Sequence, residues 1–324
     1  SRIMDALTEA VKHGKQVSVF IEVKARFDEE ANLKWGEKLE QAGINVHYSM
    51  PGVKVHSKIA LIRRFVNRQS KLYSYLSTGN FHEDTVKLYS DLGLFTADRK
   101  ITQEVARVFS FLETVQNPNK EFEHLLVGQF NLRCGLEDLI KYEIEEAKAG
   151  REAEMIVKLN SLQDPDMVNL LYEASQAGVN IRMIVRGICS IVPGIEDVSD
   201  NIEIISIVDR FLEHARVYIF HHGGEEKMYV GSADWMVRNL SNRVETAFPV
   251  YNPQIKQEIR DIMGIQLNDN VKARLIEKGK VNSYRKDTSD LAIRSQRETY
   301  YYFKRKLEQH LKEEAETPED ELVD

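Results

Sequence analysis

Cysteine is almost absent from this 324-residue sequence, which contains only Cys134 and Cys189. Two thiols exclude a framework of several disulfides and a four-thiolate metal site. Neither has a local pattern typical of an activated thiol, so we expect both to be buried and inert. The sequence also lacks an apolar run of about 18 residues, the length of a membrane-spanning helix, and we find no signal-peptide pattern. These absences predict a reducing, cytoplasmic compartment.

Proline and glycine are sparse, with 7 and 17 residues, which excludes a collagen-like chain. Hydrophobic residues make up 42% and charged residues 29%, as in ordinary globular proteins. The chain is longer than most single cores, so we expect two domains or one duplicated fold.

The negative charge of the sequence is concentrated at one end. The net charge of the chain is −7, but residues 311–324 contain seven acids against the single cation Lys312, a net of −6 that leaves −1 for all the rest. We therefore expect residues 310–324 to form a disordered, solvated tail. The overall charge consequently does not exclude an anionic substrate.

Helical and strand patterns alternate along both halves of the chain. In the first half they predict a helix over 2–13, a strand over 17–23, a helix over 28–41 and a strand over 44–48. In the second half they predict a strand over 155–159, a helix over 164–176 and a strand over 179–185. This order indicates an α/β fold with parallel pairings. The first helix leads directly into a strand, so we expect the strand that completes this unit to lie ahead of Ser1.

The two halves also resemble each other in sequence. At an offset of 158 residues, His56 falls on His214 and Lys58 falls on Arg216. Further on, the small polar turn at 77–80 lies opposite the turn at 231–234, at an offset of 154. Only two copies of a long unit indicate a pseudo-twofold duplication, not a solenoid. We expect the chemistry to lie at the junction of the halves.

Each half has a histidine followed two residues later by a cation. If residues 53–59 form one strand, then Lys54, His56 and Lys58 share a face. A single motif of this kind is most often a row of solvated side chains on the exposed face of a strand. Its duplication on apolar strands instead favours an anionic ligand, because charged groups on core strands need a partner.

Two facing imidazoles surrounded by cations suit phosphoryl transfer. One neutral imidazole can attack phosphorus, while the other, as an imidazolium, donates a proton to the departing oxygen. The cations would bind the non-bridging oxygens and disfavour protonation of the nucleophile.

The paired motifs and turns resemble the phospholipase D superfamily, and their wider context resembles the C-terminal catalytic half of the polyphosphate kinase family that uses a phosphohistidine. The resemblance extends from about residue 2 to 273. Its matching segments are 23–32, 55–58, 77–81, 88–91, 94–98, 185–190, 199–202, 206–210, 213–220 and 232–236. It implies two phospholipase D-like α/β domains, each a mixed sheet flanked by helices.

The resemblance also implies an activity: reversible transfer of the ATP γ-phosphate to inorganic polyphosphate, with Mg²⁺ required and ATP or ADP as the nucleotide. It implies that His56 is phosphorylated and that His214 is the acid/base and an ATP contact. The other implied nucleotide or phosphate contacts are Tyr89, Arg186, Arg243, Lys58 and Arg216, with Asp91 as an orienting carboxylate. Arg26 matches a position at the magnesium site, where we expect it to bind phosphate oxygens, since arginine is a poor metal ligand.

We place the first domain at residues 1–121, the second at 122–309 and the tail at 310–324. A tyrosine-rich helix over 298–312 is expected to pack on the second domain. The implied partners are ATP and polyphosphate, without nucleic acid; peripheral membrane association and a homo-oligomer stay open. Trp235 and Tyr218 are expected in the core.

Two rival functions remain at this point. One is a phospholipase D-type phosphodiesterase or transferase, although Arg63 stands where that wider pattern has an aspartate, and would instead suit a further phosphate clamp. The other is a non-catalytic fragment that binds polyanions. Whether the fragment turns over by itself also stays open, because the family's amino-terminal part is expected ahead of Ser1.

Overall fold

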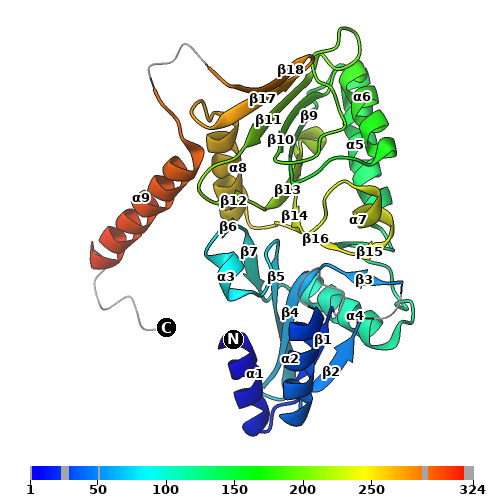
Figure 1. The fold of residues 1–324 in the computed structure, drawn as a ribbon, viewed down its shortest axis with the longest axis vertical. Coiled ribbons are helices and arrows are strands. Elements are labelled where there is room, and N and C mark those ends of the chain that lie inside the picture. The colour runs from blue at the N-terminus through cyan, green and yellow to red at the C-terminus, as the bar shows by residue number, and fades with distance from the viewer. Residues whose placement is uncertain (1, 23–28, 50–51, 287–290, 317–324) are drawn as a thin grey trace.

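The computed structural model describes residues 2–22, 29–49, 52–286 and 291–316. Figure 1 shows the two halves of the chain stacked along the long axis of the molecule. The first half contains α1 (Arg2–Lys12), β1 (Ser18–Ile21), α2 (Glu29–Gln41), β2 (Asn45–Tyr48), β3 (Lys54–Val55), β4 (Lys58–Val66), β5 (Gln69–Ser77), α3 (Glu83–Val86), β6 (Tyr89–Ser90), β7 (Gly93–Thr96) and α4 (Arg99–Thr114).

The second half begins with β8 (Leu126–Val127) and ends with a long helix, α9 (Ser295–Glu316). Between them lie α5 (Leu132–Lys148), β9 (Glu154–Leu159), α6 (Pro165–Ala177), β10 (Asn180–Val185), β11 (Ile202–Ile207), β12 (Leu212–Glu213), β13 (Arg216–Phe220), the 3₁₀ turn η1 (His222–Gly224), β14 (Lys227–Gly231), α7 (Val237–Ser241), β15 (Arg243–Val244), β16 (Thr246–Pro249), α8 (Pro253–Leu267), β17 (Ala273–Glu277) and β18 (Lys280–Tyr284).

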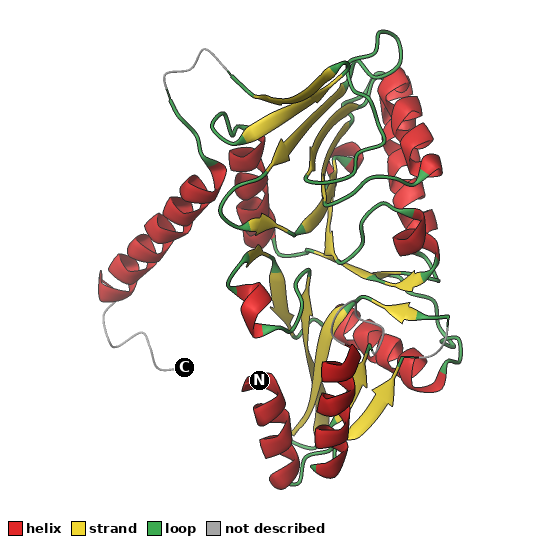
Figure 2. Ribbon diagram, in the orientation of Figure 1, coloured by secondary structure: helices red, strands yellow, loops and turns green. Residues whose placement is uncertain are grey.

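A nine-stranded mixed sheet forms the second half, in the order β18-β17-β11-β10-β9-β13-β14-β16-β8. Strands β9, β10 and β11 are parallel, and the other neighbours are antiparallel. Helices cover both faces of the sheet (Figure 2). Because successive side chains of a strand point to opposite faces, Met155, Val157 and Leu159 pack with α5 and α6, whereas Ile156 belongs to the cluster that contains residues of α4 and α8.

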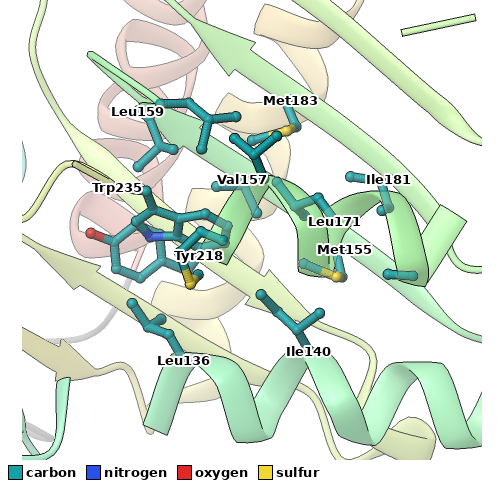
Figure 3. Close-up of a cluster of buried hydrophobic side chains, with 14 of the residues drawn as sticks. Leu136, Ile140, Met155, Val157, Leu159, Leu171, Ile181, Met183, Tyr218 and Trp235 are labelled. Atoms are coloured by element: carbon teal, nitrogen blue, oxygen red, sulfur yellow. The ribbon is translucent and has the colours of Figure 1, made fainter. Parts of the chain in front are cut away.

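The core between the sheet and α5–α6 contains Trp235 and Tyr218, the two largest fully buried side chains among the described residues (Figure 3). Trp235 and Tyr218 are fully buried there, which confirms the prediction that they are core residues. The tyrosine hydroxyl donates a hydrogen bond to the Ala233 carbonyl, so its polar atom is satisfied inside the core.

The boundaries of α6 follow from its sequence. The Asp164 carboxylate caps the first turn by accepting from the Met167 amide at 3.2 Å, and Pro165 occupies the first helical position. Gly178 ends the helix at φ 102°, a conformation that favours glycine. Predicted and observed helix agree within one residue.

The first half repeats this architecture, but among the described residues its strands form two sheets of their own, and β3 and β6 pair with strands of the second half. In the second half, β9 lies between β10 and β13. The corresponding strands of the first half, β1 and β4, belong to separate sheets among the described residues, β1-β2 and β4-β5-β7. The fold class predicted from the sequence, two related α/β halves with strands flanked by helices, is confirmed.

Two details of the sequence analysis differ from the structure. Cys134 is exposed, not buried, because α5 turns Leu132 and Leu136 inward and a residue midway between them faces away. Cys189 is half-buried, and burial raises the pKa of its thiol. Helix α9 continues to Glu316, past residue 310 where the tail was expected to begin, and residues 317–324 lie outside the described residues.

Helix α9 packs on α8 through one face only. The Tyr302 hydroxyl donates to Asp261 at 2.8 Å, and Lys306 pairs with Glu258 at 2.5 Å. Other apolar side chains of α9 are exposed, namely Tyr300, Phe303, Leu307 and Leu311. Among the helices that the structure describes, none has the length and apolar character needed to cross a membrane.

A buried carboxylate fastens the end of the first half to the beginning of the second. Glu104 of α4 is fully buried, and its oxygens accept from the amides of Glu123, His124 and Leu125 at 2.7–3.3 Å. Arg107 donates to the same carboxylate at 3.0 Å. One side chain thus fixes the start of the second half against the last helix of the first.

Replacing Glu104 should loosen this connection. Glu104→Ala leaves three amides without an acceptor, and we expect a loss of about 3 kcal/mol of stability, because each unsatisfied buried group costs roughly 1–3 kcal/mol. Thermal unfolding followed by calorimetry measures the effect. Glu113→Ala, on the same helix but with a 40% exposed side chain, is the matched control, and equal melting temperatures for the two variants would contradict the assignment.

Candidate active site at the junction of the halves

Both candidate histidines lie at bends, each of which separates two short strands of a continuous chain. The sequence analysis placed His56 within one continuous strand, and this is wrong: β3 ends at Val55 and β4 begins at Lys58. The amides of His56 and Ser57 both donate to the Val244 carbonyl, at 2.9 and 3.2 Å, which prevents a regular ladder. The histidine is thus presented at a bend, held by the backbone of the other half.

The second histidine has the same arrangement with the halves exchanged. Strand β12 ends at Glu213 and β13 begins at Arg216, and the amides of His214 and Ala215 both donate to the Ser90 carbonyl at 3.1 Å. The short parallel pairs β3-β15 and β6-β12 flank the two bends. Each half therefore positions the histidine of the other half.

A carboxylate from the second half orients His56. Its Nδ1 lies 2.9 Å from Oε2 of Glu245, a carboxylate that is fully buried. The Ser232 hydroxyl donates to the same oxygen, and the Asn239 amide donates to the other oxygen at 2.7 Å. These contacts fix the carboxylate and, through it, the imidazole ring.

A carboxylate from the first half orients His214 in the corresponding way. Its Nδ1 lies 2.7 Å from Oδ1 of Asp91, and the Thr78 hydroxyl donates to this oxygen at 2.6 Å. Gly79 is required beside it, because an added Cβ would lie 2.5 Å from Oδ2 of Asp91. Asp91 and Glu245 are 154 residues apart, as are the two turns, so the duplication includes the carboxylates.

The ionisation of these pairs favours neutral imidazoles. Burial lowers the pKa of His56 and of His214 below the ordinary value, and nearby Lys58 and Arg216 lower both further, against the opposing effect of the carboxylates. Burial raises the pKa of Glu245 and Asp91, but their contacts to the histidines bring it below its usual value. A neutral imidazole that faces an ionised carboxylate must carry its proton on Nδ1. Nε2 of each ring then keeps its lone pair.

Lys58 and Arg216 occupy equivalent positions beside the two rings. Lys58 is 5% exposed and donates to the His56 carbonyl. Arg216 donates to the His214 carbonyl at 2.8 Å, and its Nη1 lies 3.2 Å from Nε2 of that ring. The turn at 231–234 joins the two bends into one charged site, since Ser232 donates to Glu245 beside His56 and Asp234 accepts from Arg216 beside His214.

The two cations differ in their counter-ions. Arg216 binds Asp234 through two nitrogens at 3.1 and 3.3 Å, and burial would lower its pKa but the carboxylate raises it overall. The position equivalent to Asp234 in the first half is Asn80, which carries no charge. Burial lowers the pKa of Lys58 to about 7, with Arg216 adding to this effect and Glu245 opposing it.

Three other predicted contacts, Tyr89, Arg186 and Arg243, lie next to the same site. The ring of Tyr89 lies 5.0 Å from that of His214, between centroids. Arg186 donates through Nε to the Glu213 carbonyl at 2.7 Å and to Asn160 at 3.2 Å. Arg243 begins β15, paired with β3, and burial lowers its pKa. Arg26 lies outside the described residues.

Sequence reasoning missed Glu245 and misjudged Arg63. The offset of 154 from Asp91 is the signal that would have found Glu245. Arg63 is exposed and lies five residues beyond Lys58 on β4, or about 16 Å along an extended strand, so it is not a clamp for a phosphate bound beside Lys58. Asp234 and Asn239 were also missed as parts of the charge network.

Comparisons with known proteins agree over most of the chain. The family described as "Polyphosphate kinase C-terminal domain 1" matches residues 1–118, and "Polyphosphate kinase C-terminal domain 2" matches residues 125–296. A polyphosphate kinase from Vibrio parahaemolyticus is 49% identical over 94% of this chain and 44% of its own length. The chain thus spans less than half of this relative.

Two solved structures resemble the whole chain. The crystal structure of polyphosphate kinase from Porphyromonas gingivalis superposes with a TM-score of 0.88 and 44% identity, over 95% of this chain and 47% of that one. Phosphatidylserine synthase from Haemophilus influenzae has a TM-score of 0.51 and 8% identity, over 96% and 92% of the two chains. The second likeness concerns the fold alone.

The tautomers and ionisation of the two histidines can be tested directly. At pH 7 we expect ¹⁵N NMR of the imidazoles to show Nδ1 protonated and Nε2 unprotonated for both, with titration midpoints below 6.5. Because the folded-state pKa is depressed, these groups should make stability fall as the pH drops below about 6.5. A proton on Nε2 of either ring at pH 7 would refute the arrangement.

Proposed function

This chain belongs to the polyphosphate kinase family, and we propose that it forms the catalytic region of an ATP–polyphosphate phosphotransferase that works through a phosphohistidine on His56. The observation that carries the proposal is the pair of imidazole–carboxylate contacts, each of which crosses the junction between the halves. We assign residues 1–121 and 122–309 to the two domains that meet there.

In the first step, Nε2 of His56 attacks the γ-phosphorus of ATP. A P–N bond forms, the bond from this phosphorus to the β,γ-bridging oxygen breaks, and ADP leaves. In the second step, an oxygen of the terminal phosphate of polyphosphate attacks the same phosphorus and releases the imidazole. Glu245 supports both steps, since it holds the Nδ1 proton and aligns the ring.

His214 donates a proton to the departing oxygen. At neutral pH its depressed pKa leaves it uncharged, and its Nε2 lies beside Arg216. A bound phosphate adds negative charge next to the ring, which raises the pKa and favours the imidazolium needed for proton donation. Asp91 then stabilises the positive ring.

The cations are suited to bind phosphate oxygens. Lys58, Arg216, Arg186 and Arg243 surround the histidines, and burial makes their electrostatic attraction for an anion strong. Tyr89 is placed to contact the nucleotide beside His214.

We propose that Mg²⁺ is bound by oxygens of the substrate phosphates and not by a set of protein side chains. Within the described residues, no group of three or more His, Cys, Asp or Glu side chains could hold a metal ion. Asp91 and Glu245 are engaged by the histidines. Mg²⁺ bound to the substrate would neutralise charge between neighbouring phosphates, and Arg26 is proposed to bind phosphate oxygens at that place.

The covalent step can be tested by labelling. Incubation with γ-labelled ATP should place an acid-labile label on His56, and His56→Ala should abolish it. His214→Ala should slow labelling by about 100-fold or more, as loss of a general acid does. His47→Ala, a histidine on β2, is the control and should label normally. Label acquired only from a phosphodiester would support the phosphodiesterase instead, and polyphosphate binding without any transfer would support a non-catalytic protein.

Lys58 should make phosphate binding dependent on pH. Its pKa of about 7 rises when an anion binds, so binding at pH 8 should take up a proton, and affinity should fall as the pH rises above 7. Calorimetry with tripolyphosphate, in two buffers of different ionisation enthalpy, measures this uptake. Lys58→Arg should reduce it because arginine stays charged, whereas Lys71→Arg on the exposed hairpin should not. Equal uptake by the wild type and Lys58→Arg would exclude Lys58 as its source.

A further inference from the structure

The first turn of α9 holds the segment that leads into His214. The side-chain amide of Gln296 brackets Phe211: its Oε1 accepts from the Phe211 amide at 3.0 Å, and its Nε2 donates to the Phe211 carbonyl at 2.8 Å. The same Nε2 donates to Oε1 of Glu213 at 2.8 Å. Both donor hydrogens of this amide are therefore used on the short stretch that precedes His214.

The carboxylate that Gln296 contacts belongs to a buried network. Glu213 is 1% exposed and pairs with Lys158 of β9. Gln266 of α8 accepts from Lys158 at 2.9 Å and donates to Glu213 at 3.3 Å. Four elements, β9, β12, α8 and α9, meet at this carboxylate, so its position is strongly determined.

A second contact, from the residue just before α9, fixes the other end of the segment. Arg294 binds Asp209 through two nitrogens at 2.6 and 2.8 Å. The Asp209 side chain is 2% exposed. Residues 209–213 are thus anchored at both ends, Asp209 by Arg294 and Glu213 by Gln296.

This segment determines the edge on which Tyr89 and His214 meet. The Leu212 amide donates to the Leu88 carbonyl at 2.8 Å, and Leu212 and Glu213 pair with Tyr89 and Ser90. Among the described residues, the sheet β12-β6 consists of these two short strands. A ladder this short gives little rigidity of its own, and the anchored segment adds to it.

From these contacts we infer that Gln296 and Arg294 are positioning residues for the nucleotide side of the site. They hold residues 209–213 so that His214 and Tyr89 face a nucleoside triphosphate in one geometry. The inference rests on the proposed function, and neither residue is assigned a contact with substrate.

The substitution Gln296→Ala in the full-length protein tests the inference. We expect the KM for ATP to rise about tenfold while the KM for polyphosphate is unchanged, because misplacement of about 1 Å costs up to 100-fold in rate or binding. Hydrogen exchange at the Phe211 amide should accelerate. Gln309→Ala, at an exposed position of the same helix, is the matched control. A purely structural role would lower the active fraction with both substrates and move neither KM.

A charge substitution at the same position provides an independent test. Gln296→Glu places a carboxylate against Glu213 and should impair ATP use more than Gln296→Ala. If Gln296→Ala fails to fold, Arg294→Lys takes its place as the test. It keeps the charge but loses the bidentate geometry, and it should raise the KM for ATP about threefold.

The outcomes separate the two proposals. If the wild type transfers phosphate between ATP and polyphosphate but Gln296→Ala matches Gln309→Ala in both KM values, the positioning role is refuted and the proposed function stands. If the wild type shows no such transfer, the proposed function itself fails.

Discussion

The contact between a histidine of one half and a carboxylate of the other is the interaction on which the site depends. His56 lies against Glu245 and His214 against Asp91. Each contact sets a tautomer, orients a ring and joins the two halves. The backbone reinforces it, since both bends donate two amides to a single carbonyl of the opposite half. The chemistry and the docking of the halves therefore use the same atoms.

Burying so many charged groups is costly unless each has a partner. Glu245 is satisfied by three side chains, and Arg216 by Asp234. Lys58 donates to a carbonyl instead, and burial there depresses the pKa of its ammonium group. An anionic substrate would supply a counter-charge to Lys58. The imbalance between the two halves thus fits a duplicated site whose two sides bind different groups.

Much of this arrangement could be predicted from the sequence. The α6 boundaries follow from Asp164, Pro165 and Gly178, and the offset between the halves identifies His56 with His214. The bends at these histidines could not be predicted, because they result from pairing with strands of the opposite half. Glu245 could have been found from its offset of 154 residues from Asp91, but its contact with His56 of the other half could not. Local periodicity of the sequence indicates contacts between residues that are close along the chain. It gives no information about contacts between the two halves.

The reciprocal form of these contacts has an implication for the origin of the fold. When each of two similar units completes the other, the same bonds would arise between two identical chains related by a twofold axis, as in an isologous dimer. Such a dimer would contain two equal sites. In a single chain the two copies need not be identical, and equivalent positions here hold Lys58 and Arg216, and Asp91 and Glu245.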